Sequence, residues 1–95
     1  MNQLEVLGGV KGYISREVLD GKDIGLDEST PLLEWGIINS IEMARIVSFI
    51  QEQFHVKVPA DRILPDNFKD LISITSLVLE LARSQGGGTS AIVNI

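Results

Sequence analysis

The fold is decided by the stretch Leu32-Leu33-Glu34-Trp35-Gly36-Ile37-Ile38-Asn39-Ser40-Ile41-Glu42, where a glycine-containing loop gives way to a helical pattern. After Ser40, apolar residues recur at the ~3.6-residue repeat of an α-helix: Met43, Ile46, Val47, Ile50 and Phe54. The spacing predicts a helix from Ser40 to about Phe54 that buries these side chains, with Phe54 closing the stripe. Unpaired N–H groups at its start suit an anionic group such as a phosphodiester on the Ser40 hydroxyl. The preference of serine for helix N-termini also explains this position without any ligand.

Helical periodicity appears in two further segments. From Leu4 to Leu19, apolar residues recur at intervals of three and four and predict a helix that buries Leu7, Val10, Ile14 and Val18. Asp70 is a good N-cap for a last helix that ends at about Arg83. The apolar face of that helix consists of Leu71, Ile74, Leu77, Val78 and Leu81.

The connections complete an all-α architecture. A long polar loop from Asp20 to Gly36 lies over the core, and a short helical turn is expected at 60–64, between Pro59 and Pro65. We therefore predict a four-helix bundle of three long helices and one short one, with a long first loop. Residues 1–84 form the domain, and residues 85–95, which contain three consecutive glycines, form a flexible C-terminal tail.

Composition excludes several classes of function. The chain has 95 residues, no cysteine and one histidine, so it can form no disulfide, thiolate metal site or protein-borne catalytic thiol. We find no catalytic constellation and no metal site, and we expect a protein that is not an enzyme. The net charge of −5 disfavours nucleic acid as a ligand. No apolar run is long enough to span a membrane and no signal peptide is apparent, so we expect a cytoplasmic monomer.

Helix geometry places a candidate partner-binding surface beside Ser40. At ~100° per residue, Ile41 and Ser48 lie opposite the buried stripe, with Ala44 on the flank. Arg45 shares this outer face and Glu42 lies at its margin. An apolar side chain beside a hydroxyl, surrounded by charges, suits a protein partner, although isolated exposed apolar residues are common.

The same stretch resembles the phosphopantetheine attachment site of acyl and peptidyl carrier proteins. Gly36-Ile37-Ile38-Asn39-Ser40-Ile41 is similar to free-standing carriers of the aminoacyl and D-alanyl type. The resemblance continues through the blocks 46–54, 56–59 and 65–68 and covers residues 10 to 83. Two departures stand out: Asn39 replaces the usual aspartate before the serine, and Arg45 lies on a face that is usually acidic.

The resemblance implies a function for each part of the site. It implies 4′-phosphopantetheine on Ser40, attached by a phosphopantetheinyl transferase, with Asn39 and Ile41 flanking the attachment point. An adenylate-forming enzyme would load an acyl or aminoacyl group as a thioester. Downstream enzymes of a biosynthetic pathway, of the nonribosomal peptide or polyketide kind, would then process it. Asn39 lacks the carboxylate that a transferase can recognise, and Arg45 suggests a dedicated partner.

Other interpretations remain open from the residues alone. The chain could be an unmodified helical interaction module or scaffold that binds a partner through the Ile41 face. Trp35 is expected to anchor the first loop rather than to stand exposed, and His55 to be a surface residue at a helix end. The acidic residues Asp20, Asp23, Asp27 and Glu28 lack the ligand spacing of an EF-hand and are expected to form a solvated loop.

Overall fold

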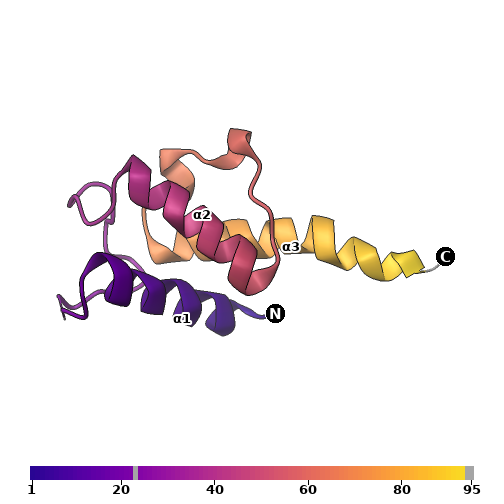
Figure 1. Ribbon diagram of the computed structural model, residues 1–95, viewed down its shortest axis with the longest axis horizontal. Coiled ribbons are helices and arrows are strands. Elements are labelled where there is room, and N and C mark those ends of the chain that lie inside the picture. Colours follow the sequence, from indigo (N-terminus) through magenta and orange to yellow (C-terminus); the bar gives the residue numbers. More distant parts are fainter. Residues whose placement is uncertain (23, 94–95) are drawn as a thin grey trace.

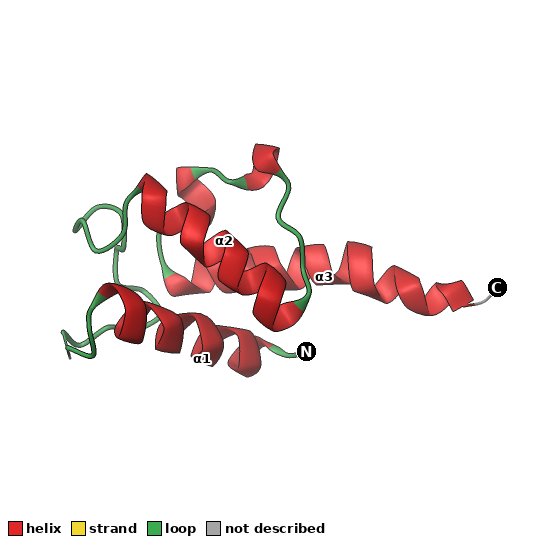
Figure 2. Cartoon of the chain, in the orientation of Figure 1, coloured by secondary structure: helices red, strands yellow, loops and turns green. Residues whose placement is uncertain are grey.

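Three α-helices form the protein in the computed structural model, which describes residues 1–22 and 24–93, with side chains for 1–22 and 24–85. They are α1 (Gln3–Tyr13), α2 (Ser40–Phe54) and α3 (Leu71–Val93). The described part of the chain contains no strand (Figure 2). Helix α1 packs against both α2 and α3, and α3 extends beyond the other two helices (Figure 1). The expected all-α class is confirmed.

The short helix expected at 60–64 is not an α-helix. The chain instead forms two 3-10 turns, η2 (Ala60–Arg62) and η3 (Pro65–Asn67). Each turn is closed by two backbone bonds, among them those from the Ile63 N–H to the Ala60 carbonyl and from the Phe68 N–H to the Pro65 carbonyl. The second turn begins at a proline, which has no N–H to continue the preceding turn.

The first helix buries two of the four residues expected. Val10 and Ile14 are fully buried as predicted, whereas Leu7 and Val18 are only partly buried at the edge of the core. Val6 is fully buried instead of Leu7, since Val6, Val10 and Ile14 follow one another at intervals of four residues on the same helix face. A Cβ at Gly9 would lie 2.8 Å from Cζ of Phe54, so α1 approaches the Phe54 ring more closely there than a side chain would allow.

Helix α1 also ends earlier than expected. Residues Ile14–Val18 (η1) continue it as a π-helical turn, in which the Leu19 N–H donates to the Ile14 carbonyl at 3.0 Å. Asp20 then takes a left-handed conformation with φ of 54°, which ends the helical path.

The faces of α2 agree with the sequence at three core positions. Met43, Ile46 and Ile50 are buried, but Val47 and Phe54 are only partly buried. Phe54 therefore does not close the core as expected. Its ring lies edge-on to Phe49, with the ring centroids 6.0 Å apart.

Helix α3 begins where the sequence indicates and continues further. The Ser73 N–H donates to Asp70 Oδ1 at 2.8 Å, so the Asp70 cap is confirmed. All five predicted core positions of this helix are buried. The expected end at about Arg83 is wrong, because the helix runs to Val93, through most of the residues expected to form a tail.

Two contacts fasten the segment between α2 and α3. Gln85 pairs with both backbone groups of Lys57: its Nε2 donates to the Lys57 carbonyl at 2.8 Å, and its Oε1 accepts from the Lys57 N–H at 3.0 Å. Arg62 donates to Glu80 Oε1 at 3.0 Å, which lowers the pKa of the Glu80 carboxyl and raises that of the Arg62 guanidinium. Both of these side chains are solvated, so the ion pair adds little stability. Gln85 therefore links α3 to the segment that follows α2.

A substitution at Thr75 tests this packing. Thr75 is 1% exposed, and its Oγ1 has no hydrogen-bond partner in the described part of the structure. An unpaired buried hydroxyl costs about 1–3 kcal/mol. We expect Thr75→Val, which keeps the branched shape, to raise the free energy of unfolding by about 1 kcal/mol in urea denaturation. Thr75→Ser, which keeps the hydroxyl but removes a methyl group, is the matched control and should lower the free energy of unfolding. A loss of stability in the valine variant would show that the hydroxyl is satisfied.

Candidate functional site

The segment before Ser40 is fixed by the backbone of Leu32. The Leu32 N–H donates to the Lys69 carbonyl at 2.8 Å, next to the start of α3. The Leu32 carbonyl accepts from the N–H groups of Ile37 and Ile38, at 2.8 and 3.2 Å. The Leu32 side chain is fully buried. These bonds tie the approach to α2 to the core and to α3.

Asn39 is the N-cap of α2 and forms a reciprocal capping box with Glu42. Asn39 Oδ1 accepts from the N–H groups of Ile41 and Glu42, at 2.9 and 3.1 Å. The Asn39 N–H donates in return to Glu42 Oε1 at 2.9 Å. The amide oxygen of Asn39 thus accepts the two hydrogen bonds that an aspartate would accept with a carboxylate oxygen. The departure from the usual aspartate leaves the start of the helix intact.

Ser40 is the first residue of α2 and is exposed. In the described part of the structure its hydroxyl makes no hydrogen bond, so it is available for modification. The capping box, however, changes the expected anion site: it occupies the N–H groups of Asn39, Ile41 and Glu42 and leaves only that of Ser40. The Glu42 carboxylate also lies at the helix start, where it opposes a second anion. The helix N-terminus is therefore a weaker phosphodiester site than the sequence suggests.

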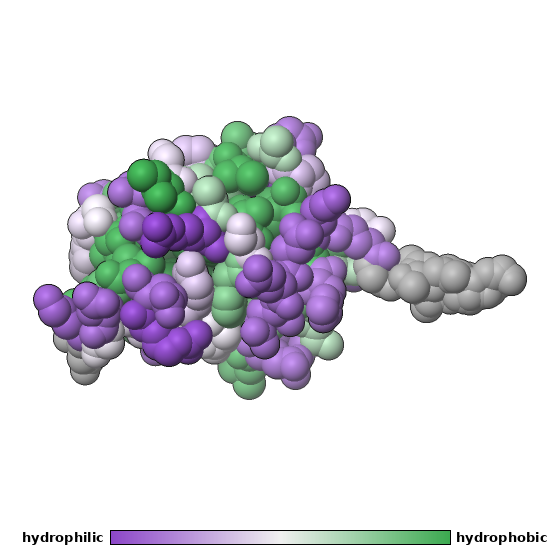
Figure 3. All heavy atoms as spheres, viewed as in Figure 1, coloured by the Kyte–Doolittle hydropathy of each residue, from purple (hydrophilic) through white to green (hydrophobic). Residues whose placement is uncertain are grey.

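The structure brings the predicted partner-binding residues together on one face of α2. Ile41 is 64% exposed, and Ala44, Arg45 and Ser48 are exposed along the same side. Glu42 is half-buried because its carboxylate is held in the capping box. Arg45 and Ser48 also border a hollow of about 180 Å³ between α1 and α2. Figure 3 shows apolar and charged side chains interspersed on the surface of the molecule.

Trp35 does not anchor the first loop, and that expectation was wrong. Its side chain is 64% exposed, although its backbone is held in a compact turn. The Trp35 N–H donates to the Pro31 carbonyl at 3.1 Å, and Gly36 adopts a φ of 70° that favours glycine. Leu26 and Leu32 are the buried anchors of the loop instead. Sequence reasoning missed Trp35 because its hydrophobic character favoured burial.

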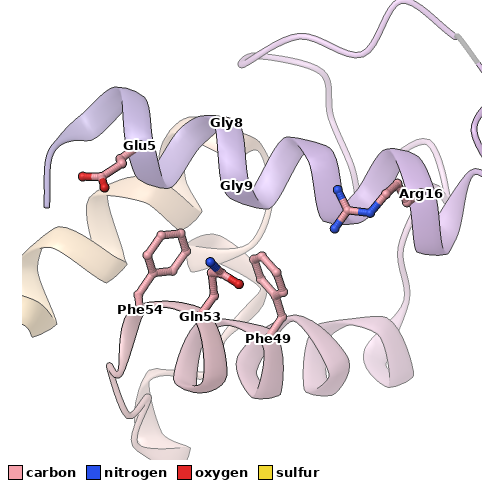
Figure 4. A pocket seen from close by; sticks show the side chains of 7 residues that line it. All are labelled: Glu5, Gly8, Gly9, Arg16, Phe49, Gln53 and Phe54. Atoms are coloured by element: carbon pink, nitrogen blue, oxygen red, sulfur yellow. The ribbon is translucent and has the colours of Figure 1, made fainter.

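A second groove lies between α1 and α2 and is separate from this site. Figure 4 shows Phe49 and Phe54 pointing from α2 toward the glycines of α1, with Glu5 of α1 at one end and Arg16 of η1 at the other. Its volume is about 320 Å³. Phe54 is the last residue of α2 and Ser40 the first, so the groove's far end is roughly 20 Å along the helix from Ser40 at 1.5 Å per residue.

The remaining candidates have structural roles. Asp27 Oδ1 accepts from the Ser29 N–H at 2.8 Å and the Thr30 hydroxyl at 3.2 Å, so Asp27 shapes a turn. Asp23 lies outside the described residues. Within those residues, no three acidic, histidine or cysteine side chains gather in a possible metal site. His55 is exposed at the end of α2, as expected, in a left-handed conformation with φ of 58°.

Comparison with known proteins supports the importance of this region. Residues 10–81 match the family described as phosphopantetheine attachment site. The chain is 34% identical over 79 residues to a probable acyl carrier protein, PigG, of Serratia sp. (strain ATCC 39006); the match covers 82% of this chain and 91% of PigG. A chain from a crystal structure described as an FAD-dependent dehydrogenase matches with a TM-score of 0.68 and 34% identity, over 74% of this chain and 99% of that one. That solved chain is therefore shorter than the present one.

The capping box gives a prediction about stability. Asn39→Ala removes the oxygen that accepts two N–H groups, so it should lower the free energy of unfolding by about 0.5–2 kcal/mol. Asn39→Asp keeps an oxygen in the same place and should stay within about 0.5 kcal/mol of the parent at neutral pH. Urea denaturation of the three proteins measures both effects. Equal stability of the alanine variant would mean that the cap contributes nothing.

Proposed function

The chain belongs to the family of carrier proteins with a phosphopantetheine attachment site, and we propose that Ser40 is the attached residue. In this family the cofactor is 4′-phosphopantetheine, joined covalently to a serine. Its terminal thiol supplies what the chain lacks, since the sequence has no cysteine. Like other carriers, the chain performs no catalysis itself; it holds an acyl group and presents it to enzymes.

The exposed, unpartnered hydroxyl of Ser40 carries this proposal. Among the described serines, Ser40 alone is the first residue of an α-helix, and the turn before it is held by backbone hydrogen bonds. The hydroxyl points from a fixed position, so an enzyme can reach it without unfolding the carrier. We see no base placed to activate it, which fits an attachment point rather than a catalytic nucleophile.

We propose that the outer face of α2 receives the partner enzymes. Ile41 offers an apolar contact beside the attachment point, with Ala44 and Ser48 further along, and Arg45 offers a positive charge that would favour an acidic partner surface. Glu42 serves mainly the capping box. The expected partners are a phosphopantetheinyl transferase, an adenylate-forming enzyme and downstream acyl-processing enzymes.

We further propose that the cargo belongs to a biosynthetic pathway of the nonribosomal peptide or polyketide kind, in which the carrier acts as a monomer. The similarity to PigG, a probable acyl carrier protein, supports an acyl cargo, because the match covers most of both chains. A flavin-dependent dehydrogenase is a reasonable partner class, since the solved chain of similar fold comes from a structure described in those terms.

The turns η2 and η3 and the first loop would complete the carrier bundle. No described helix is long and apolar enough to cross a membrane.

Incubation with a promiscuous phosphopantetheinyl transferase and coenzyme A tests the attachment site. Intact mass should rise by one phosphopantetheine, and Ser40→Ala should abolish the gain. Ser76→Ala, which removes an exposed hydroxyl of α3, is the matched control and should be modified fully. An unmodified parent chain would favour the rival function, a helical interaction module that carries no arm.

Loading by the cognate adenylate-forming enzyme tests the docking face. Ile41→Asp should slow the initial rate of thioester formation on fully modified protein by about tenfold or more, because an unpaired carboxylate would be buried at the contact. Arg45→Glu should slow it roughly threefold to tenfold, mainly through association. Lys11→Glu reverses an exposed charge on α1 and should load normally. If Ile41→Asp loads normally, the enzymes approach from another side.

A further inference from the structure

The attachment site contains an exposed tryptophan that the docking face does not use. Trp35 is the only tryptophan of the chain, and its side chain is 64% exposed. Its backbone is fixed, because the Trp35 N–H donates to Pro31 and the Gly36 N–H donates to Leu33, each at 3.1 Å. An exposed indole on a fixed backbone can bind an apolar group at a reduced cost in conformational entropy. The turn therefore presents a preformed binding surface.

The start of α2 leaves little to hold the base of an arm attached to Ser40. Three of the four N–H groups at the helix start are occupied by the capping box, and the Glu42 carboxylate lies beside them. A phosphodiester on Ser40 would find one free N–H group and a neighbouring negative charge. Contacts that restrict the arm must therefore lie further along it.

The arm is long enough to reach the indole. About fourteen atoms in line separate the Ser40 oxygen from the thiol sulfur, which is roughly 15–17 Å at ~3.3–3.6 Å per three chain atoms. Trp35 and Ser40 are five positions apart, so even a fully extended chain would separate them by at most about 18 Å. The hydrogen bonds from Ile37 and Ile38 back to Leu32 fold this segment and shorten that distance.

We propose that the indole of Trp35 is the resting surface of the phosphopantetheine arm, an inference that rests on the proposed function of Ser40. The ethylene segments in the far half of the arm, between its two amides and next to the thiol, pack against the indole face, while the amides remain in water. The tether supplies a high effective concentration, so a weak apolar contact is sufficient. Docking of a partner enzyme on α2 then releases the arm from Trp35.

Fluorescence of the single tryptophan tests the contact. Intact mass first establishes that the chain is fully modified, and so tests the proposed function separately. The acrylamide quenching constant of Trp35 should then fall by up to about twofold from the unmodified to the modified protein, with a blue shift of emission. Removal of the arm by a carrier-protein phosphodiesterase should restore both values. Ser40→Asp supplies negative charge without an arm and should behave like the unmodified protein.

The arm's thiol gives a second readout, because the chain itself contains no cysteine. In the modified protein, Trp35→Ala should raise the rate of reaction with a bulky disulfide reagent by about twofold, since the arm is no longer held. Ile24→Ala, which truncates another exposed apolar residue of the first loop, should leave that rate unchanged. Complete modification with unaltered quenching, emission and thiol reactivity would overturn the proposal. The proposal would also be overturned if Ser40→Asp, which carries no arm, produced the same fall in the quenching of Trp35. If Trp35→Ala instead slows only the transferase, the indole is a contact for the enzyme and not for the arm.

Discussion

The position of Leu32 controls the geometry of the site. Its buried side chain belongs to the core, its N–H is bonded to Lys69 beside the start of α3, and its carbonyl receives Ile37 and Ile38 just before α2. One residue thus connects the interior, the third helix and the segment that ends at Ser40. A carrier must present its attachment point to several enzymes in turn, and a fixed hydroxyl lets each of them meet the same geometry. The backbone bonds of Leu32 provide this rigidity, although the described residues between Val18 and Ser40 form no helix.

Much of the fold follows from local patterns in the sequence. The start of α2, three of its core positions, the Asp70 cap and the buried face of α3 agree with helical periodicity and capping preferences, because these depend on neighbouring residues. Periodicity placed Val10 and Ile14 of α1 correctly but chose Leu7 over Val6, because both lie within about one turn of Val10 and tertiary packing decides between them. The end of α3 was placed too early because the three consecutive glycines at 86–88 indicated a tail.

Sequence reasoning predicted some features of the candidate site correctly and missed others. Helix geometry placed Ile41, Ala44, Arg45 and Ser48 on the outer face, and the structure agrees. It could not show that Asn39 and Glu42 would occupy the N–H groups at the helix start, because Asn-Ser is compatible with several capping arrangements. Nor could it show that Trp35 would face water, since an indole in a loop is buried or exposed according to tertiary packing. The sequence therefore indicated Ser40 as the proposed attachment point, whereas the surroundings of that residue required coordinates.

The amide of Gln85 has a consequence for the dynamics of the bundle. It occupies the N–H and the carbonyl of Lys57 in the way that a neighbouring strand would, in a segment that belongs to no sheet. The amide proton of Lys57 is therefore hydrogen-bonded to a side chain of α3, and its exchange with solvent deuterium requires that bond to break. Because both residues are exposed, rotation of the Gln85 side chain is enough to break it, so this one proton reports how often the contact between α3 and the segment after α2 opens.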